Sequence, residues 1–191
     1  MRVALFALLG LAASLAAAAE VAGVRLPDTE SLGPGGTPLV LNGAGARKRA
    51  FFQVYAIGLS LAERRTAGAE AIGAPGAKRI AIHMLRDVGA DAFVEALVEG
   101  IRENHSAAEL AALEPRVKQL SATLAELKEA KKGMRITLDW VPAAGTRLAV
   151  EGRPAGSPIP GEDFYRALLR IWLGERPVQD DLKRALLGEK Q

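Results

Sequence analysis

The sequence predicts an α+β protein in which an antiparallel β-sheet and a layer of helices pack against each other. Strand-like and helix-like segments occur in separate blocks along the chain, which argues against a doubly wound parallel sheet. The segment 162–173 is apolar on nearly every side, and such a helix is expected between layers rather than on the surface. The chain of 191 residues has the length of one domain.

The expected strands are rich in β-branched and aromatic residues, or they alternate apolar with polar side chains. A turn is expected at 43–45, just before a run that is long enough for one bent strand or two. The strands are expected at 21–26, 38–41, 47–63, 78–85, 134–141 and 146–151.

The expected helices show apolar side chains at helical spacing and have recognisable ends. Ser106 and Glu109 have the spacing of a capping box, and Pro115 is expected to break the helix that follows. Gly174 and Gly188 are expected to end the last two helices. The helices are expected at 67–74, 91–104, 106–132, 162–173 and 178–187.

The N-terminus has the pattern of a cleavable signal peptide. Arg2 is followed by an almost wholly apolar stretch and by an Ala-x-Ala site, with cleavage expected between Ala19 and Glu20. The stretch is too short and too rich in alanine to predict a stable membrane span. We therefore expect a signal peptide at 1–19 and a periplasmic domain at 20–191. The chain has no cysteine, which is compatible with export of a domain of this size.

Composition and motifs argue against several classes of function. The formal net charge is +3, and the basic groups lack the interleaved aromatic residues of a nucleic-acid surface, so no nucleic-acid partner is expected. His83 and His105 have no carboxylate cluster at ligand spacing, so no metal site is expected. The glycines at 43 and 45 lack the third glycine of a dinucleotide fingerprint, and no cofactor is expected.

The most informative stretch is 41–61, where an arginine precedes a strongly strand-forming run. The guanidinium of Arg47 and the phenol of Tyr55 on one strand system are suited to anchor a carboxylate or a phenolate. Gly43 and Gly45 can bring the backbone close to a neighbour or a ligand, because glycine has no Cβ. Three further aromatic residues are expected in the core: Phe51, Phe52 and Phe93.

The same stretch resembles the signature of the chalcone isomerase-like family. Gly43-Ala44-Gly45-Ala46-Arg47 is followed by an aromatic run that ends in Ala56-Ile57-Gly58-Leu59. The resemblance covers essentially the whole predicted mature chain. The matched segments together resemble the exported bacterial branch of the family. It extends to the segments 82–88, 104–106, 132–140, 159–174 and 177–188.

The resemblance implies the chalcone isomerase fold, an antiparallel sheet covered on one face by helices with a ligand cleft between them. Arg47 matches the arginine of the isomerases, and Tyr55 falls where those enzymes carry a threonine. Phe93 and Gly100 align with their tyrosine and asparagine, so the groups that stabilise an enolate are missing. Fatty-acid-binding members of the family use an arginine and a tyrosine on these strands, and this sequence keeps that pair.

Three hypotheses about function remain open from the sequence. The first is a non-catalytic periplasmic binder of a small amphipathic carboxylate such as a fatty acid, held by Arg47 and Tyr55, with Phe93 and Gly100 beside an apolar tail. The second is an isomerase or intramolecular lyase that uses Arg47 and Tyr55 on an unidentified substrate. The third is a protein-interaction module of the cell envelope. A general base opposite Tyr55 would favour the second over the first.

Overall fold

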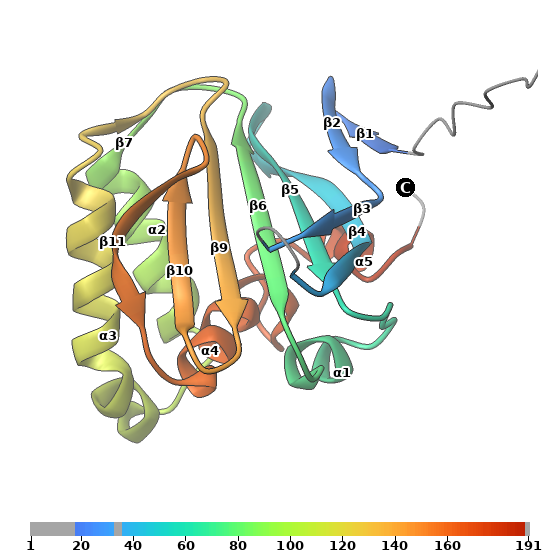
Figure 1. Cartoon of the computed structure of the whole chain (residues 1–191). Helices are drawn as coiled ribbons and strands as arrows, with labels where there is room; N and C mark the ends of the chain where they lie inside the picture. Colours follow the sequence, from blue (N-terminus) through green and yellow to red (C-terminus); the bar gives the residue numbers. More distant parts are fainter. Residues whose placement is uncertain (1–17, 33–35, 190–191) are drawn as a thin grey trace, which may run out of the picture.

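The computed structural model describes residues 18–32 and 36–189, and a seven-stranded antiparallel sheet forms its centre (Figure 1). The strand order is β11-β10-β9-β6-β5-β4-β3. The strands of this sheet are β3 (Thr29–Ser31), β4 (Pro38–Arg49), β5 (Phe52–Leu61), β6 (Lys78–Met84), β9 (Arg135–Val141), β10 (Gly145–Val150) and β11 (Arg153–Ile159). Two small antiparallel pairs flank it: β1 (Ala18–Val21) with β2 (Val24–Pro27), and β7 (Val88–Gly89) with β8 (Glu129–Ala130).

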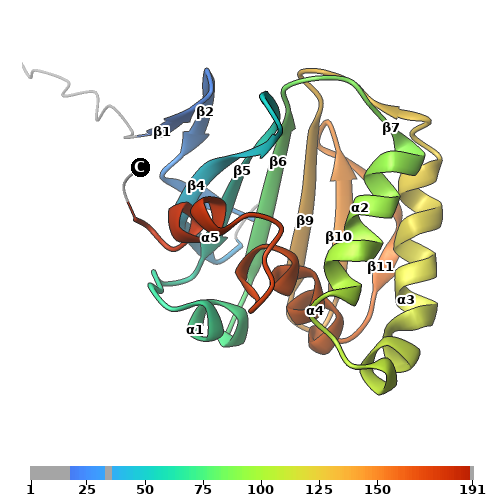
Figure 2. The same cartoon turned by 180° about the vertical axis from the view of Figure 1, so that it is seen from behind.

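The helices gather on one face of the sheet, as Figure 2 shows. The last helix lies over β4, the fourth contacts β10 and the third lies along β11. The helices are α1 (Gly68–Gly73), α2 (Ala90–Arg102), α3 (Ala107–Ala125), α4 (Glu162–Leu173) and α5 (Asp180–Leu186). This separation of strands and helices into layers confirms the predicted α+β class.

The hydrophobic core lies between the sheet and the helices. Ile57, Ile82 and Ile136 stand side by side on three neighbouring strands and point to the helical face. They belong to the same buried cluster as Phe164 and Leu168 of α4. Helix α4 is buried on most of its surface, as predicted. Adjacent residues of a strand alternate between faces, and the residues on the opposite face of β5, β6 and β9 are mostly small or polar.

Strand β4 corrects the expected turn at 43–45. The strand runs without interruption from Pro38 to Arg49, and its pairing with β5 shifts register between Leu41 and Gly43. Gly43 allows a close approach between β4 and α5 instead of a turn. An ideal Cβ on Gly43 would lie 2.2 Å from the carbonyl oxygen of Ala185, so the backbone of α5 rests against β4 at this point.

The second half of the chain differs from the sequence prediction at two places. Helix α3 is not broken at Pro115, although the predicted capping box of Ser106 and Glu109 is present at its start. Strand β11 was not among the expected strands, and Pro154 and Pro158 lie within it. Proline is tolerated there because β11 forms the edge of the sheet, where one side of the strand needs no backbone donors.

Two of the three phenylalanines expected in the core lie instead at the tip of the hairpin formed by β4 and β5, with Phe51 in the turn and Phe52 at the start of β5. Phe51 is 100% exposed and Phe52 is 58% exposed, whereas Phe93 packs against the core as expected. Residues 1–17 of the predicted signal peptide lie outside the described residues, and the expected cleavage site after Ala19 falls within β1.

Candidate functional site

Arg47 and Tyr55 lie directly opposite each other on β4 and β5. Residues that oppose each other in an antiparallel pair project to the same face of the sheet. Tyr55 packs against the core cluster on the side covered by the helices, so both side chains face the layer formed by α4 and α5. The structure therefore brings together the two residues that the sequence singled out.

Arg47 has polar partners but no acidic one among the described residues. Its Nη1 donates to Oε1 of Gln179 at 3.1 Å and to the carbonyl oxygen of Lys48 at 2.5 Å. A guanidinium offers five N–H donors, so several remain for a ligand. Gln179 immediately precedes α5 and also donates to the carbonyl oxygen of Ala46 at 3.3 Å, which fixes the helix start on β4.

Tyr55 accepts a hydrogen bond from Trp172 of α4, whose Nε1 lies 3.0 Å from the phenol oxygen. Burial raises the pKa of Tyr55, while the bond from Trp172 and the charge of Arg47 oppose that rise. The phenol is therefore protonated near neutral pH. Its own proton has no acceptor within the described part of the chain and can be donated to an anion beside Arg47.

The other two predicted site residues lie on α2. Phe93 packs at the edge of the core, and Gly100 faces α4. A Cβ on Gly100 would lie 2.7 Å from Cγ2 of Ile171, so the space expected for an apolar tail is filled by that side chain. Gly100 is thus a close-packing contact between two helices. Because Ile171 and Trp172 are adjacent, the end of α4 links Gly100 to the pair on the strands.

Sequence reasoning missed two residues of this site, Trp172 and Gln179. A buried indole N–H usually finds an acceptor, so a tryptophan in an otherwise apolar helix is a signal for a polar neighbour. No comparable signal exists for Gln179. Its position depends on how α5 settles on β4, which the local sequence does not encode.

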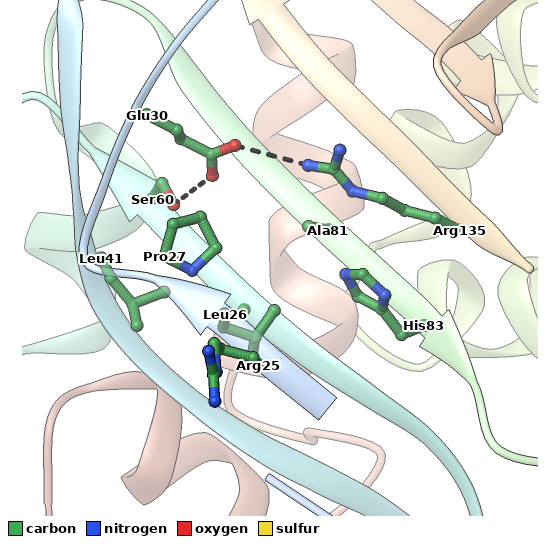
Figure 3. Close-up of a pocket in the computed structure, with 10 residues that line it drawn as sticks. Arg25, Leu26, Pro27, Glu30, Leu41, Ser60, Ala81, His83 and Arg135 are labelled. Atoms are coloured by element: carbon green, nitrogen blue, oxygen red, sulfur yellow. Dashed lines mark hydrogen bonds and ion pairs between the residues drawn. The ribbon is translucent and has the colours of Figure 1, made fainter. Parts of the chain in front are cut away.

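A hollow of about 180 Å³ lies on the opposite face of the sheet, beneath β2 and β3 (Figure 3). At one side of it, Glu30 accepts hydrogen bonds from Ser60 at 2.8 Å and from Arg79 at 2.5 Å, and it lies 3.5 Å from Arg135. Arg79 also donates two hydrogen bonds of 2.7 Å to the carboxylate of Asp139. The hollow is lined by Arg25, Leu26, Pro27, Glu30, Leu41, Gly58, Ser60, Ala81, His83 and Arg135.

Within the described residues, the structure holds no cluster of three or more histidine, aspartate or glutamate side chains that could bind a metal ion. Among the helices of residues 18–32 and 36–189, none has the length and hydropathy to cross a bilayer.

A curled antiparallel sheet under one helical layer, with an arginine and a tyrosine facing that layer, defines a sheet-and-helix domain of the chalcone isomerase type. The family model described as chalcone isomerase-like matches residues 18–188, and the chain belongs to this family. The resemblance seen in the sequence is thereby confirmed.

One solved structure extends the comparison. This chain is similar in structure to a fatty-acid binding protein of Arabidopsis thaliana, whose crystal structure matches it with a TM-score of 0.66 and 17% sequence identity. The match covers 86% of this chain and 92% of the plant protein, which confirms the fold over nearly the whole domain. No curated protein matched this chain.

Proposed function

We propose that this protein is a non-catalytic binder of a small amphipathic carboxylate, such as a fatty acid, and that Arg47 and Tyr55 hold the carboxylate. The observation that carries the proposal is a half-buried arginine with no acidic partner among the described residues, opposite a protonated phenol. Membership of the chalcone isomerase-like family and the similarity to a plant protein titled as fatty-acid binding support it.

The chemistry of the pair fits a carboxylate. Two parallel N–H groups of a guanidinium match the two oxygens of a carboxylate, and such charge-assisted bonds are stronger than neutral ones. The proton of Tyr55 supplies a third bond to the same group. Binding would neutralise the charge of Arg47 on a face of the sheet where burial makes an unpaired charge costly.

The apolar tail enters the interior only if the helical layer separates from the sheet. The space next to the pair is occupied by Trp172, whose bond to Tyr55 ties α4 to β5. Helix α5 is short and starts at the residue after Gln179, which contacts Arg47. The carboxylate can use the remaining donors of Arg47 and the proton of Tyr55 while these two bonds stay in place, but entry of the tail requires both helices to move, so binding and opening are coupled.

The contacts of Tyr55 favour binding over isomerisation. A general base must accept a proton from the substrate. Among the described residues, the polar groups around the phenol are the N–H of Trp172 and the guanidinium of Arg47, and both act as donors. This arrangement suits recognition of an anion more than proton abstraction.

Calorimetric titration with palmitate tests the assignment. Arg47→Gln is expected to weaken binding about 10- to 100-fold, and Tyr55→Phe less, since hydrogen bonds to charged groups contribute more than neutral ones. Arg25→Gln is the matched control, because Arg25 lines the hollow on the opposite face. Unchanged affinity in Arg47→Gln would refute the anchor. A loss of affinity in Arg25→Gln alone would indicate that the ligand binds on the other face of the sheet.

We further propose that the protein works in the periplasm after removal of residues 1–19. The N-terminal pattern of Arg2, an apolar stretch and an Ala-x-Ala site supports this. Intact-mass measurement of the protein from the periplasm of an expressing bacterium is expected to give the mass of 20–191. Organic extraction of the same sample should release a fatty acid. A full-length protein confined to the cytoplasm would contradict the location.

A further inference from the structure

The turn between β4 and β5 exposes two large aromatic side chains. Phe51 is 100% exposed and Phe52 is 58% exposed, and these are the exposed large hydrophobic residues of the described chain. The tip stands at one end of the sheet, with β1 and β2 as its neighbours (Figure 2). Phe51 contributes nothing to the core, and with Phe52 beside it the tip presents two neighbouring apolar rings to the surroundings.

Exposed cations surround these rings. Lys48 and Arg49 immediately precede the turn, and both are exposed. Arg86 lies with its guanidinium carbon 4.6 Å from the centre of the Phe52 ring. Lys132 lines the same surface hollow as both phenylalanines.

Two acidic side chains lie near these four cations. Asp181 is 3.9 Å from Lys48, and Asp87 accepts a bond from the backbone of Lys132 at 2.7 Å. The four cations outnumber them, so the surface around the tip is positively charged.

We propose that this tip docks on the surface of an anionic lipid bilayer. Phe51 enters the boundary between headgroups and acyl chains, where an apolar ring replaces contacts with water. Lys48, Arg49, Arg86 and Lys132 then lie at the level of the lipid phosphates. Each basic residue near an anionic membrane surface adds to the attraction, and the attraction falls within a Debye length.

The shape of the tip favours a bilayer over a protein partner. A stable protein interface buries about 800 Å² on each partner, with a well-packed apolar centre. A two-residue turn with one fully exposed ring offers a narrow point and not such a surface. A bilayer accepts a single inserted ring, since lipids rearrange around it.

Docking would also place the proposed ligand site close to lipid. Arg47 directly precedes Lys48, so the pair of Arg47 and Tyr55 lies at the base of the tip. The two proposals remain separable, because docking uses the exposed tip and needs no ligand at Arg47.

Co-sedimentation with lipid vesicles tests the docking. The wild-type protein is expected to bind vesicles of equal parts phosphatidylcholine and phosphatidylglycerol, and to remain unbound with phosphatidylcholine alone. Phe51→Ser and Arg49→Glu are each expected to weaken binding about tenfold. Both positions are exposed, so the variants should fold like the wild type. Raised salt should release the protein.

Arg153→Glu is the matched control, because it makes the same change of charge at an exposed residue of the edge strand β11. It is expected to bind like the wild type. Every variant has the same N-terminus, so differences between them report on the tip. Wild-type protein that does not sediment, equal binding to both kinds of vesicle, or an equal loss in Arg153→Glu would each overturn the proposal. Retained vesicle binding in Arg47→Gln would show that docking is independent of the carboxylate site.

Discussion

At the residue scale, the contact between β4 and α5 depends on two neighbouring residues. Gly43 has no Cβ, which leaves room for the backbone oxygens of Ala185 and Leu186. Asn42 is buried, and its Nδ2 donates to the carbonyl oxygen of Leu186 at 2.7 Å and to that of Arg65 at 3.0 Å. A small residue and a polar one thus hold the end of a helix whose start contacts Arg47 through Gln179.

The lowered pKa of His83 leads us to expect that stability depends on pH. It is half-buried on the polar face of the sheet, and burial followed by the charge of Arg135 lowers its pKa, with Glu151 and Glu30 opposing. In the unfolded chain a histidine titrates near its usual value of about 6.5. Below that pH the unfolded state binds more protons than the native state, so the free energy of unfolding falls as the pH decreases.

The variant His83→Gln should lose part of this dependence. Urea unfolding at about pH 7 and about pH 5.5, on either side of the unfolded value, measures the change for both proteins. The wild type is expected to lose more stability than the variant over this interval. An equal loss in the two proteins would show that other groups carry the dependence.

Residue identity predicted part of the site and not the rest. The spacing of Arg47 and Tyr55 within a strand-rich run was enough to expect them on one strand system, and they oppose each other across β4 and β5. Apolar character alone placed Phe51 in the core, yet it lies exposed at a turn. A hydrophobic side chain tends to be buried, but a residue in a tight turn between two strands can lie too far from the core for burial.

At the element scale, an ion pair with a fully buried lysine joins the sheet to the helical layer. Lys78 at the start of β6 is 0% exposed, and its Nζ lies 2.9 Å from Oε1 of Glu162 at the start of α4. Burial lowers the pKa of Lys78 and Glu162 opposes that shift, which shows how closely the ammonium depends on its partner. Glu162 is 33% exposed and also contacts Arg166.

Removing the carboxylate of Glu162 should destabilise the protein more than removing the buried ammonium of Lys78. Glu162→Ala leaves a buried ammonium without a counter-ion, and a loss of about 3 kcal/mol in the free energy of unfolding is expected. Lys78→Met keeps a similar volume and removes the charge, so it is expected to be nearly neutral. Chemical denaturation of both variants measures the difference.

Glu114→Ala is the control for this comparison. Glu114 and Lys118 form an exposed pair at 2.7 Å on α3, and solvent screening leaves such a pair with little effect on stability, so this variant is expected to unfold almost like the wild type. If Lys78→Met destabilises the protein as much as Glu162→Ala, the salt bridge itself, and not the unpaired charge, is what stabilises the contact.

Secondary structure was predictable where local signals agree with tertiary packing. Helix α4 has both an apolar surface and a stop at Gly174, and it was found with the expected bounds. Pro115 led to a wrong prediction, because it lies inside a helix whose apolar side chains Leu113 and Leu120 are held in the core. The edge strand that contains Pro158 was not predicted at all.

At the scale of the whole molecule, the two faces of the sheet have different chemistry. The helical face is filled by the hydrophobic core, while the other face carries the network of Glu30, Arg79 and Asp139. Alternation along β6 predicted this two-sided character. The filling of the expected cleft was not predictable, because it depends on pairs such as Gly100 and Ile171 that come from different helices.

The topology predicts a gradient of stability across the molecule. Strand β6 is paired on both sides, with β5 and β9, and its apolar residues lie in the core. Strands β1 and β2 pair only with each other within the described chain, and each has four residues. A short two-stranded pair is marginally stable on its own. Local opening should therefore expose β1 and β2 long before the sheet unfolds.

Hydrogen exchange measured by mass spectrometry tests this gradient. Amides of β6 are expected to exchange only through global unfolding, because both neighbouring strands must separate first. Amides of β1 and β2 are expected to exchange at least about a hundredfold faster, since their opening costs a small part of the global free energy. Equal protection of β1 and β6 would mean that the N-terminal pair unfolds together with the core and is an integral part of the cooperative domain.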